Sequence, residues 1–449
     1  MIKKISLILF YIFLLSNLNS VFAYNVSYTH KETGEPIRWD NTQTIRYWVD
    51  PDPNTPGNLT YEQLNSLLQE AMKIWESVPT AKVPHFEFAG YLPEDINGEN
   101  YGEYVRLSDC YTSDLDACES EAQKNLQTVI IFDRDHSILS NELCRIQDCS
   151  AHGSPDVFEG SSTDGVTSIM QGHVVLRRYT SAPEQFMAVA LHELGHLLGL
   201  GHVSHNHQLY QVYNLGYDEV DPLLFYASMD DGTLSTERIT LNPDDELGIS
   251  VLYPSDTFES ETAIVSGYVV QSDGITAMSR VNVVARETSD PLCKAYSAIT
   301  ERYCPMGGNF GQLCSYYYTP TGAYIFEGLP PGTYTIEVEE ISQNQNVNNT
   351  EQALLGDAEF WNQGDAASED PYLRDTITVA AGDVVEDIDI VLNGNTSEER
   401  ERFIPLDQFD IPETTACVDS TTDYAALIGY ETPSNSTAPT GGCSLIVDR

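Results

Sequence analysis

The chain has 449 residues, which is too long for one ordinary hydrophobic core and predicts two or three domains. Its 68 acidic and 22 basic residues give a formal net charge of −46 at pH 7. This charge excludes nucleic acids and anionic membranes as partners, because both bind basic surfaces. The strong negative charge instead favours solubility of the protein in a salty or cation-rich medium. Calcium binding is an alternative role for the carboxylates, although no D-x-[DN]-x-[DN]-G loop locates a site.

Residues 1–23 have the pattern of a secretory signal peptide. Lys3 and Lys4 precede an apolar run from Ile5 to Leu15, and the small residue Ala23 stands at the expected cleavage site. An uncleaved membrane anchor is the alternative, but no stop-transfer pattern follows. We therefore expect a secreted or cell-surface protein. Removal of the two lysines moves the formal net charge from −46 to −48.

The nine cysteines fit an exported and oxidised protein. They form three groups along the chain: Cys110, Cys118, Cys144 and Cys149; Cys293, Cys304 and Cys314; and Cys417 and Cys443. The first group can close on itself, most simply by pairing nearest neighbours, although four cysteines allow three connectivities. One of the other five is left over, and for Cys443 we expect either a disulfide with Cys417 or an unpaired thiol. No C-x2-C pair is present, which favours disulfides over metal ligation.

Strand and helix patterns alternate in the first half of the chain. Apolar runs and period-two alternation predict strands at 42–50, 85–90, 128–133 and 173–179. Helical spacing of apolar residues predicts a helix over 60–78, which Thr60 and Gln63 begin as a capping box. These elements together predict a mixed α and β domain.

A second helix is predicted over 182–200. Ser181 with Glu184 three residues later is a second candidate capping box. Gly199 and Gly201 mark its end, because glycine accepts the left-handed conformation that terminates helices. A third helix, 242–253, has Asn242 as its cap and Pro243 in its first turn.

The pattern changes after a polar linker at 255–263. Period-two stretches with glycine and proline turns predict strands and a small β-sandwich. The stretches are 263–270, 279–288, 322–329, 332–341, 375–382 and 384–392. From 396 onward the chain is acidic and rich in serine and threonine, and we expect a tail with little structure of its own.

The second helix carries the residues of a metal site. His192 and His196 stand four apart, so both rings can bind one ion from the same helix face. Glu193 points off that axis and suits the general base of a hydrolase that acts on a metal-activated water. Because the helix ends at Gly199, the chain can turn back and bring His202 to the same ion as a third ligand.

His192, Glu193, His196, Gly199 and His202 complete the pattern H-E-x-x-H-x-x-G-x-x-H. This signature resembles that of the metzincin zinc endopeptidases. Met229 in "LLFYASMDDGT" suits the methionine turn of that clan, and 242–253 looks like the last helix of a matrixin-type catalytic domain. The resemblance covers about Trp39 to Tyr253. It implies one catalytic zinc, hydrolysis of peptide bonds and a protein or peptide substrate.

Two alternatives remain open. A structural zinc site is disfavoured because three histidines leave a position open for water, although His205 or His207 could fill it. A secreted binding or adhesion protein with a non-catalytic metzincin-like domain would have little reason to keep Glu193.

The sequence departs from the matrixin pattern in two places. Met229 follows His202 by 27 positions, a longer interval than in compact matrixins. We expect the intervening residues to lie beside the cleft and to shape substrate access. Four tyrosines among them are candidate substrate contacts or transition-state donors: Tyr210, Tyr213, Tyr217 and Tyr226. No cysteine precedes Cys110, so a cysteine-switch propeptide is not expected.

The stretch "GAYIFEGLPPGTYTIEVEE" resembles carboxypeptidase regulatory-like (prealbumin-like) β-sandwich modules, with a turn at 329–332 and Tyr334 and Ile336 facing inward. The predicted fold is therefore α+β: a metzincin-type catalytic domain with a mixed sheet and an active-site helix, followed by an all-β sandwich. The predicted segments are a signal peptide at 1–23, a zinc metallopeptidase domain at 24–257, the sandwich at 258–395 and the acidic tail at 396–449.

Overall fold

The computed structural model describes the chain in segments. These are 26–27, 36–51, 59–105, 126–133, 136–140, 151–157, 168–177, 182–203, 206, 225, 227–230, 239–300, 322–341, 356–394, 403–412, 417 and 423–429. The predicted signal peptide and the first group of cysteines lie outside these residues. Within the described segments, no helix has the length and apolar character needed to cross a membrane.

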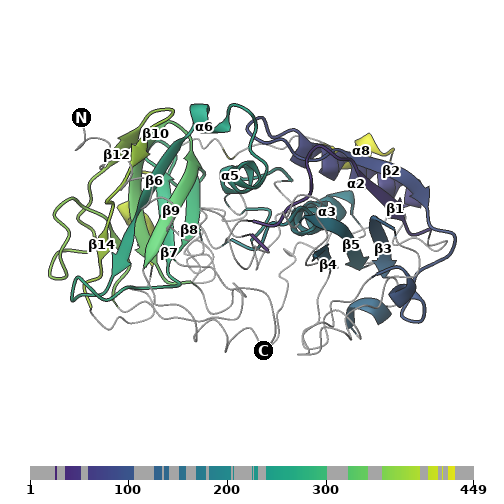
Figure 1. Cartoon of the computed structure of the whole chain (residues 1–449), viewed down its shortest axis with the longest axis horizontal. Helices are drawn as coiled ribbons and strands as arrows, with labels where there is room; N and C mark the ends of the chain where they lie inside the picture. Colours follow the sequence, from purple (N-terminus) through teal and green to yellow (C-terminus); the bar gives the residue numbers. More distant parts are fainter. Residues whose placement is uncertain are drawn as a thin grey trace, which may run out of the picture.

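A mixed sheet forms the first half of the molecule (Figure 1). Its strands are β1 (Ile45–Val49), β2 (Phe86–Tyr91), β3 (Thr128–Asp133), β4 (Ala151–Val157) and β5 (Ile169–Arg177). The order is β2-β1-β3-β5-β4, and all neighbours are parallel except β4 and β5. The predicted α and β mixture is confirmed. The sequence did not predict β4, because Gly153 and Pro155 weaken its strand pattern; Pro155 fits at the edge of a sheet.

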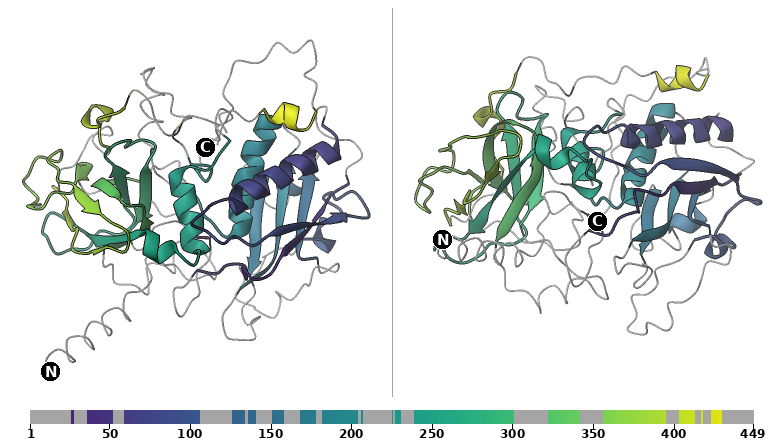
Figure 2. Two further views of the ribbon diagram at one scale, coloured as in Figure 1. Left: turned by 90° about the horizontal axis from the view of Figure 1, so that it is seen from above. Right: turned by 45° about the horizontal axis from the view of Figure 1, so that its top comes forward.

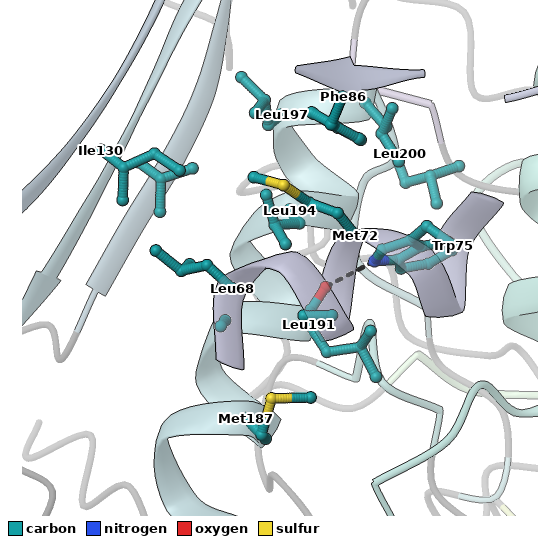
Figure 3. Close-up of a cluster of buried hydrophobic side chains, with 14 of the residues drawn as sticks. Leu68, Met72, Trp75, Phe86, Ile130, Met187, Leu191, Leu194, Leu197 and Leu200 are labelled. Atoms are coloured by element: carbon teal, nitrogen blue, oxygen red, sulfur yellow. Dashed lines mark hydrogen bonds between the residues drawn. The ribbon is translucent and has the colours of Figure 1, made fainter. Parts of the chain in front are cut away.

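Two long helices cover one face of this sheet: α2 (Tyr61–Glu76) and α3 (Pro183–Leu198) (Figure 2). Leu68 and Met72 of α2 pack against Leu194 of α3 in a shared apolar core (Figure 3). At the centre of this contact, the indole Nε1 of Trp75 donates a hydrogen bond of 2.9 Å to the carbonyl of Leu191. A smaller apolar cluster covers the opposite face and includes the short 3₁₀ helix η1 (Tyr101–Glu103).

The helix starts follow the predictions in part. Thr60 and Gln63 form the predicted capping box of α2. The predicted box of Ser181 and Glu184 is wrong for α3, because Ala182 is the N-cap and no side chain caps the helix. Pro183 explains the difference: the residue before a proline disfavours the helical conformation, so Ala182 stands as the N-cap and Glu184 occupies N2 rather than the N3 position that a capping box needs.

Two shorter helices lead to the second half of the molecule. They are α5 (Pro243–Leu252) and α6 (Phe258–Glu261). Asn242 caps α5 as predicted and forms a capping box with Asp245. Leu247 and Val251 of α5 belong to the apolar core of the second half, so α5 lies between the two halves (Figure 1).

We call residues 263–394 the β-rich region. Its strands are β6 (Ala263–Val270), β7 (Asn282–Glu287), β8 (Ala295–Ile299), β9 (Ala323–Leu329), β10 (Gly332–Glu339), β11 (Glu359–Phe360), β12 (Ile377–Val379), β13 (Val384–Val385) and β14 (Ile390–Val391). One sheet has the order β11-β10-β7-β8 with β12 beside β10, and the other has the order β13-β6-β14 with β9 beside β6. Apolar residues of both sheets form one core, which includes Tyr334 and Ile336.

The C-terminal tail makes contacts that the sequence did not predict. Its elements are short: η6 (Leu406–Gln408) and α8 (Tyr424–Leu427). Phe403 and Ile404 are buried, and Tyr424 joins the core of α2 and α3. The hydroxyl of Tyr424 donates a hydrogen bond of 3.1 Å to the carbonyl of Ile239. The tail therefore reaches back to the first half of the molecule.

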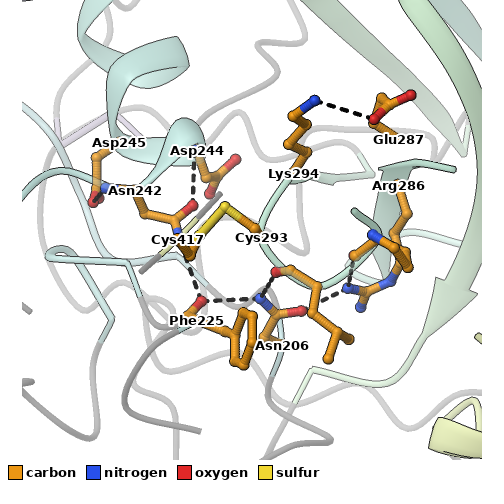
Figure 4. Close-up of a disulfide and its surroundings, with 12 residues drawn as sticks. Asn206, Phe225, Asn242, Asp244, Asp245, Arg286, Glu287, Cys293, Lys294 and Cys417 are labelled. Atoms are coloured by element: carbon orange, nitrogen blue, oxygen red, sulfur yellow. Dashed lines mark hydrogen bonds and ion pairs between the residues drawn. A yellow bond between two sulfur atoms is a disulfide. The ribbon is translucent and has the colours of Figure 1, made fainter. Parts of the chain in front are cut away.

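A disulfide holds part of this tail (Figure 4). Cys417 bonds Cys293, which is 124 residues earlier in the chain. Of the two alternatives for Cys443, the disulfide with Cys417 is therefore wrong. Cys417 lies in a buried cluster with Cys293, Leu292 and Phe225, so tertiary packing decides the pairing rather than proximity in sequence.

Peptide mapping without reduction tests this disulfide. We expect a linked pair of peptides that contain Cys293 and Cys417, and a Cys417–Cys443 linked pair would contradict the structure. Cys417→Ser should lower the free energy of unfolding by about 2 to 4 kcal/mol, because the unfolded chain gains conformational freedom. Urea denaturation of the variant and the unaltered chain measures this change.

Candidate metal centre

Three histidines meet at the end of α3. The Nε2 atom of His196 lies 3.0 Å from that of His192 and 3.0 Å from that of His202. The Nε2 atoms of His202 and His192 are 3.2 Å apart. In the part of the chain that the structure describes, this is the one group of three or more potential ligands close enough to share a metal ion. The calcium alternative gains no support from these residues.

Gly199 makes the third histidine reachable. It adopts a left-handed conformation with φ of 105° and ends α3. Its N–H donates to the carbonyl of His196 at 2.9 Å, and the N–H of Leu200 donates to the carbonyl of Gly195 at 3.0 Å. The chain therefore leaves the helix axis sharply, and His202 returns to the side where His192 and His196 lie.

Backbone carbonyls orient two of the rings. The Nδ1 atom of His192 lies 2.7 Å from the carbonyl of Ser228, and that of His196 lies 2.8 Å from the carbonyl of Leu200. A carbonyl only accepts, so each Nδ1 carries the proton and each Nε2 directs a lone pair into the centre. Burial, together with the neighbouring His196, lowers the pKa of His192 to about 3. The ring is thus neutral, as metal ligation requires.

The donor set fits zinc. Two donors of a tetrahedral zinc, each about 2.0 to 2.1 Å from the ion, lie about 3.3 Å apart. The observed separations of 3.0 to 3.2 Å between Nε2 atoms are close to this value. Three imidazoles also leave one of four positions for a water molecule or a substrate.

Glu193 is buried beside the histidines against strand β4. The residue is 6% exposed. Burial raises the pKa of this carboxyl to about 8, while a hydrogen bond from the backbone N–H of Gly153 acts in the opposite direction. The strand approaches α3 so closely that a Cβ at Gly153 would lie 2.3 Å from the carbonyl oxygen of Glu193. Sequence reasoning missed this contact because it missed β4.

Met229 forms a turn beneath the centre. The N–H of Val203 donates to the carbonyl of Met229 at 3.0 Å. The carboxylate of Asp245 accepts from the backbone N–H groups of Ser228 at 2.6 Å and Met229 at 3.1 Å. Asp245 therefore holds the peptide whose carbonyl orients His192. Asp245 was not singled out from the sequence.

Two further histidines lie in the same half of the molecule, of which His173 is buried and His152 is partly buried. The rings of His152 on β4 and His173 on β5 stack with centroids 5.3 Å apart. Burial lowers the pKa of His152 to about 4 and that of His173 to about 3. Neither residue was singled out from the sequence. Several predicted candidates lie outside the described residues: His205, His207, Tyr210, Tyr213, Tyr217 and Tyr226.

Residues 38–254 match the family model of the matrixins. The matched range contains the three histidines, Glu193 and the Met229 turn, and it ends directly after α5. The match supports a metzincin-like, zinc-dependent metallopeptidase domain in this part of the chain. The β-rich region lies outside the match. A comparison of the chain with curated proteins finds no match.

Gly195→Ala is expected to destabilise the protein by about 1 to 3 kcal/mol through overpacking. A Cβ at this position would lie 2.2 Å from the sulfur of Met229 and 3.0 Å from Cζ2 of Trp75. The clash outweighs the gain in helix propensity, which is about 1 kcal/mol. Gly102→Ala is the control, because a Cβ there meets nothing within 4 Å. Urea denaturation compares the two variants, and equal effects would contradict the packing.

Acidification is expected to destabilise the metal-free protein. His152 and His173 stay neutral in the fold, while unfolded histidines bind protons below a pH of about 6.5. Their contribution to stability is therefore complete above about pH 6.5 and is lost as the pH falls toward about 4, by up to about 1.4 kcal/mol per pH unit for each ring. Urea denaturation in a chelating buffer measures this loss, and a midpoint that does not fall would contradict it.

Proposed function

We propose that the chain is a secreted zinc-dependent endopeptidase that hydrolyses peptide bonds in proteins. His192, His196 and His202 are the zinc ligands of this proposal, and Glu193 is the general base. The observation that carries it is the convergence of three Nε2 atoms within 3.2 Å of one another, beside a buried carboxyl. The matrixin match over residues 38–254 supports the same chemistry.

Zinc bound by the three histidines would polarise the scissile carbonyl and make a water molecule more acidic. Glu193 takes the proton from that water and delivers it to the leaving amine. Its neighbours suit this role: the N–H of Gly153 holds the carboxylate, and burial keeps bulk water from competing for the proton. A cation beside Glu193 would also favour the ionised form that a base needs.

The position of β4 suggests how a substrate binds. β4 is the last strand in the described sheet, and its Gly153 contacts Glu193. An extended peptide can add to a sheet edge through main-chain hydrogen bonds. In our proposal the substrate lies along β4, so that its scissile bond passes Glu193 and the histidines.

We further propose that the β-rich region is a carboxypeptidase regulatory-like sandwich domain, within the boundaries 258–395. Two sheets with a common core and the short connection between β9 and β10 support this fold. Its role in this proposal is that of a stabiliser rather than a substrate-binding module. The domain boundaries 24–257 and 396–449, and secretion after cleavage of residues 1–23, belong to the same proposal.

Glu193→Gln is the direct test. We expect casein cleavage to fall by about 10²- to 10⁴-fold, because general acid–base catalysis is lost. Zinc content should stay unchanged, since the three histidines remain. His202→Ala should instead lose zinc. Activity assays and metal analysis of the purified full-length chain measure both quantities, with a chelator as the zero-zinc reference.

Glu184→Gln is the matched control, because Glu184 lies on the same helix in its first turn, away from the histidines. It should cleave casein like the unaltered chain. Cleavage by Glu193→Gln at the unaltered rate would contradict the proposed role of Glu193. Zinc binding without any cleavage of a broad substrate would favour the non-catalytic binding protein.

A further inference from the structure

Asn206 follows His202 by four residues and is completely buried. Its side chain forms hydrogen bonds with three separate parts of the chain. Its Nδ2 donates to the carbonyl of Phe225 at 3.0 Å and to that of Leu292 at 2.8 Å. Its Oδ1 accepts from Nη1 of Arg286 at 2.6 Å (Figure 4). Asn206 has a left-handed φ of 59°, a conformation that asparagine tolerates better than most residues.

Arg286 comes from strand β7 of the β-rich region and is itself completely buried. Its Nε bonds Oε1 of Glu337 at 2.7 Å, and its Nη1 also donates to the carbonyl of Pro291 at 3.0 Å. The ring of Phe409 from the tail lies 5.0 Å from the guanidinium carbon. Contacts other than the one to Asn206 therefore fix the planar guanidinium on several sides. This makes Arg286 a rigid hydrogen-bond donor to Asn206.

The residues that Asn206 joins also contact the surroundings of the metal centre. Phe225, whose carbonyl accepts from Asn206, also accepts from Nδ2 of Asn242 at 3.2 Å. Asn206 therefore joins the two ends of the long interval between His202 and the Met229 turn. At one end Val203 bonds Met229, and at the other the carbonyl of Ser228 orients His192.

A second contact joins the same two parts of the molecule. Asp244 accepts from the backbone N–H of Ser297 at 2.9 Å and from its hydroxyl at 3.1 Å. Ser297 lies on β8 of the β-rich region. The next residue, Asp245, holds the Met229 turn. Of these two neighbouring carboxylates at the start of α5, Asp244 thus binds the β-rich region and Asp245 binds the Met229 turn beneath the metal centre.

We propose that Arg286 and Asn206 are positioning residues of the metal centre, so that the β-rich region sets the place of His202. Arg286 holds the amide of Asn206, and Asn206 holds the segment that follows the third ligand. This inference rests on the proposed zinc site and extends it: metal affinity depends on a side chain outside the matrixin match.

Asn206→Gly tests the proposal in the full-length chain. Glycine accepts the left-handed backbone at this position, so the variant removes the amide contacts without new strain. We expect zinc affinity to fall by about 10- to 100-fold, as for other residues that orient metal ligands. We also expect a changed visible spectrum of the cobalt-substituted protein, which reports the ligand geometry. Competition with a chromophoric chelator measures the affinity.

Arg286→Met should also lower the zinc affinity and change the visible spectrum of the cobalt-substituted protein. Asn282→Ala is the control, because Asn282 is equally buried on β7 but its amide donates to Glu339 at 3.0 Å. The control should keep the zinc affinity and cobalt spectrum of the unaltered chain.

An Asn206→Gly variant with unaltered zinc affinity and cobalt spectrum would overturn the inference. Equal losses in Asn206→Gly and Asn282→Ala would also overturn it, because they would reflect general destabilisation of the β-rich region. Failure of the unaltered chain to bind zinc would be a separate result. It would contradict the proposed function, and the inference would fail with it.

Discussion

The left-handed residue at the end of α3 is the constraint on which the metal centre depends. A helix alone can offer His192 and His196 to one ion, but a continued helix would carry the next histidine away along its axis. Gly199 ends the helix with φ of 105° and sends the chain back. This conformation costs any residue with a Cβ about 1 to 2 kcal/mol, whereas glycine adopts it freely. The convergence of three Nε2 atoms follows from this one turn.

Burial then gives the converging side chains their chemistry. His192 and His196 are neutral because burial lowers the pKa of both rings, and backbone carbonyls select the tautomer that points their Nε2 atoms inward. Burial shifts the pKa of Glu193 in the opposite direction: it raises this pKa and so favours the protonated, neutral carboxyl. A divalent cation at the histidines would suit both groups. It binds neutral nitrogen donors, and its charge stabilises the ionised form of a nearby carboxylate.

The support for these groups comes from distant parts of the chain. Gly153 on an edge strand meets Glu193, and Asp245 at the start of α5 holds the turn that orients His192. The adjacent Asp244 binds the β-rich region. The tail and the Cys293–Cys417 disulfide pack into the same interface. The two halves of the molecule are therefore joined where the floor of the metal centre is built.

Local patterns in the sequence determined the helices, the Thr60 capping box and the spacing of the three histidines, because helix geometry and capping depend on residues a few positions apart. The other features depend on contacts between elements that are far apart in the sequence. β4 has a poor strand pattern and exists through its pairing with β5. The roles of Asp245 and Asn206 depend on partners 16 and 80 residues away. Cys417 likewise pairs with the distant Cys293 because a buried cluster brings them together. Such contacts are set by the packing of whole elements, which no local spacing encodes.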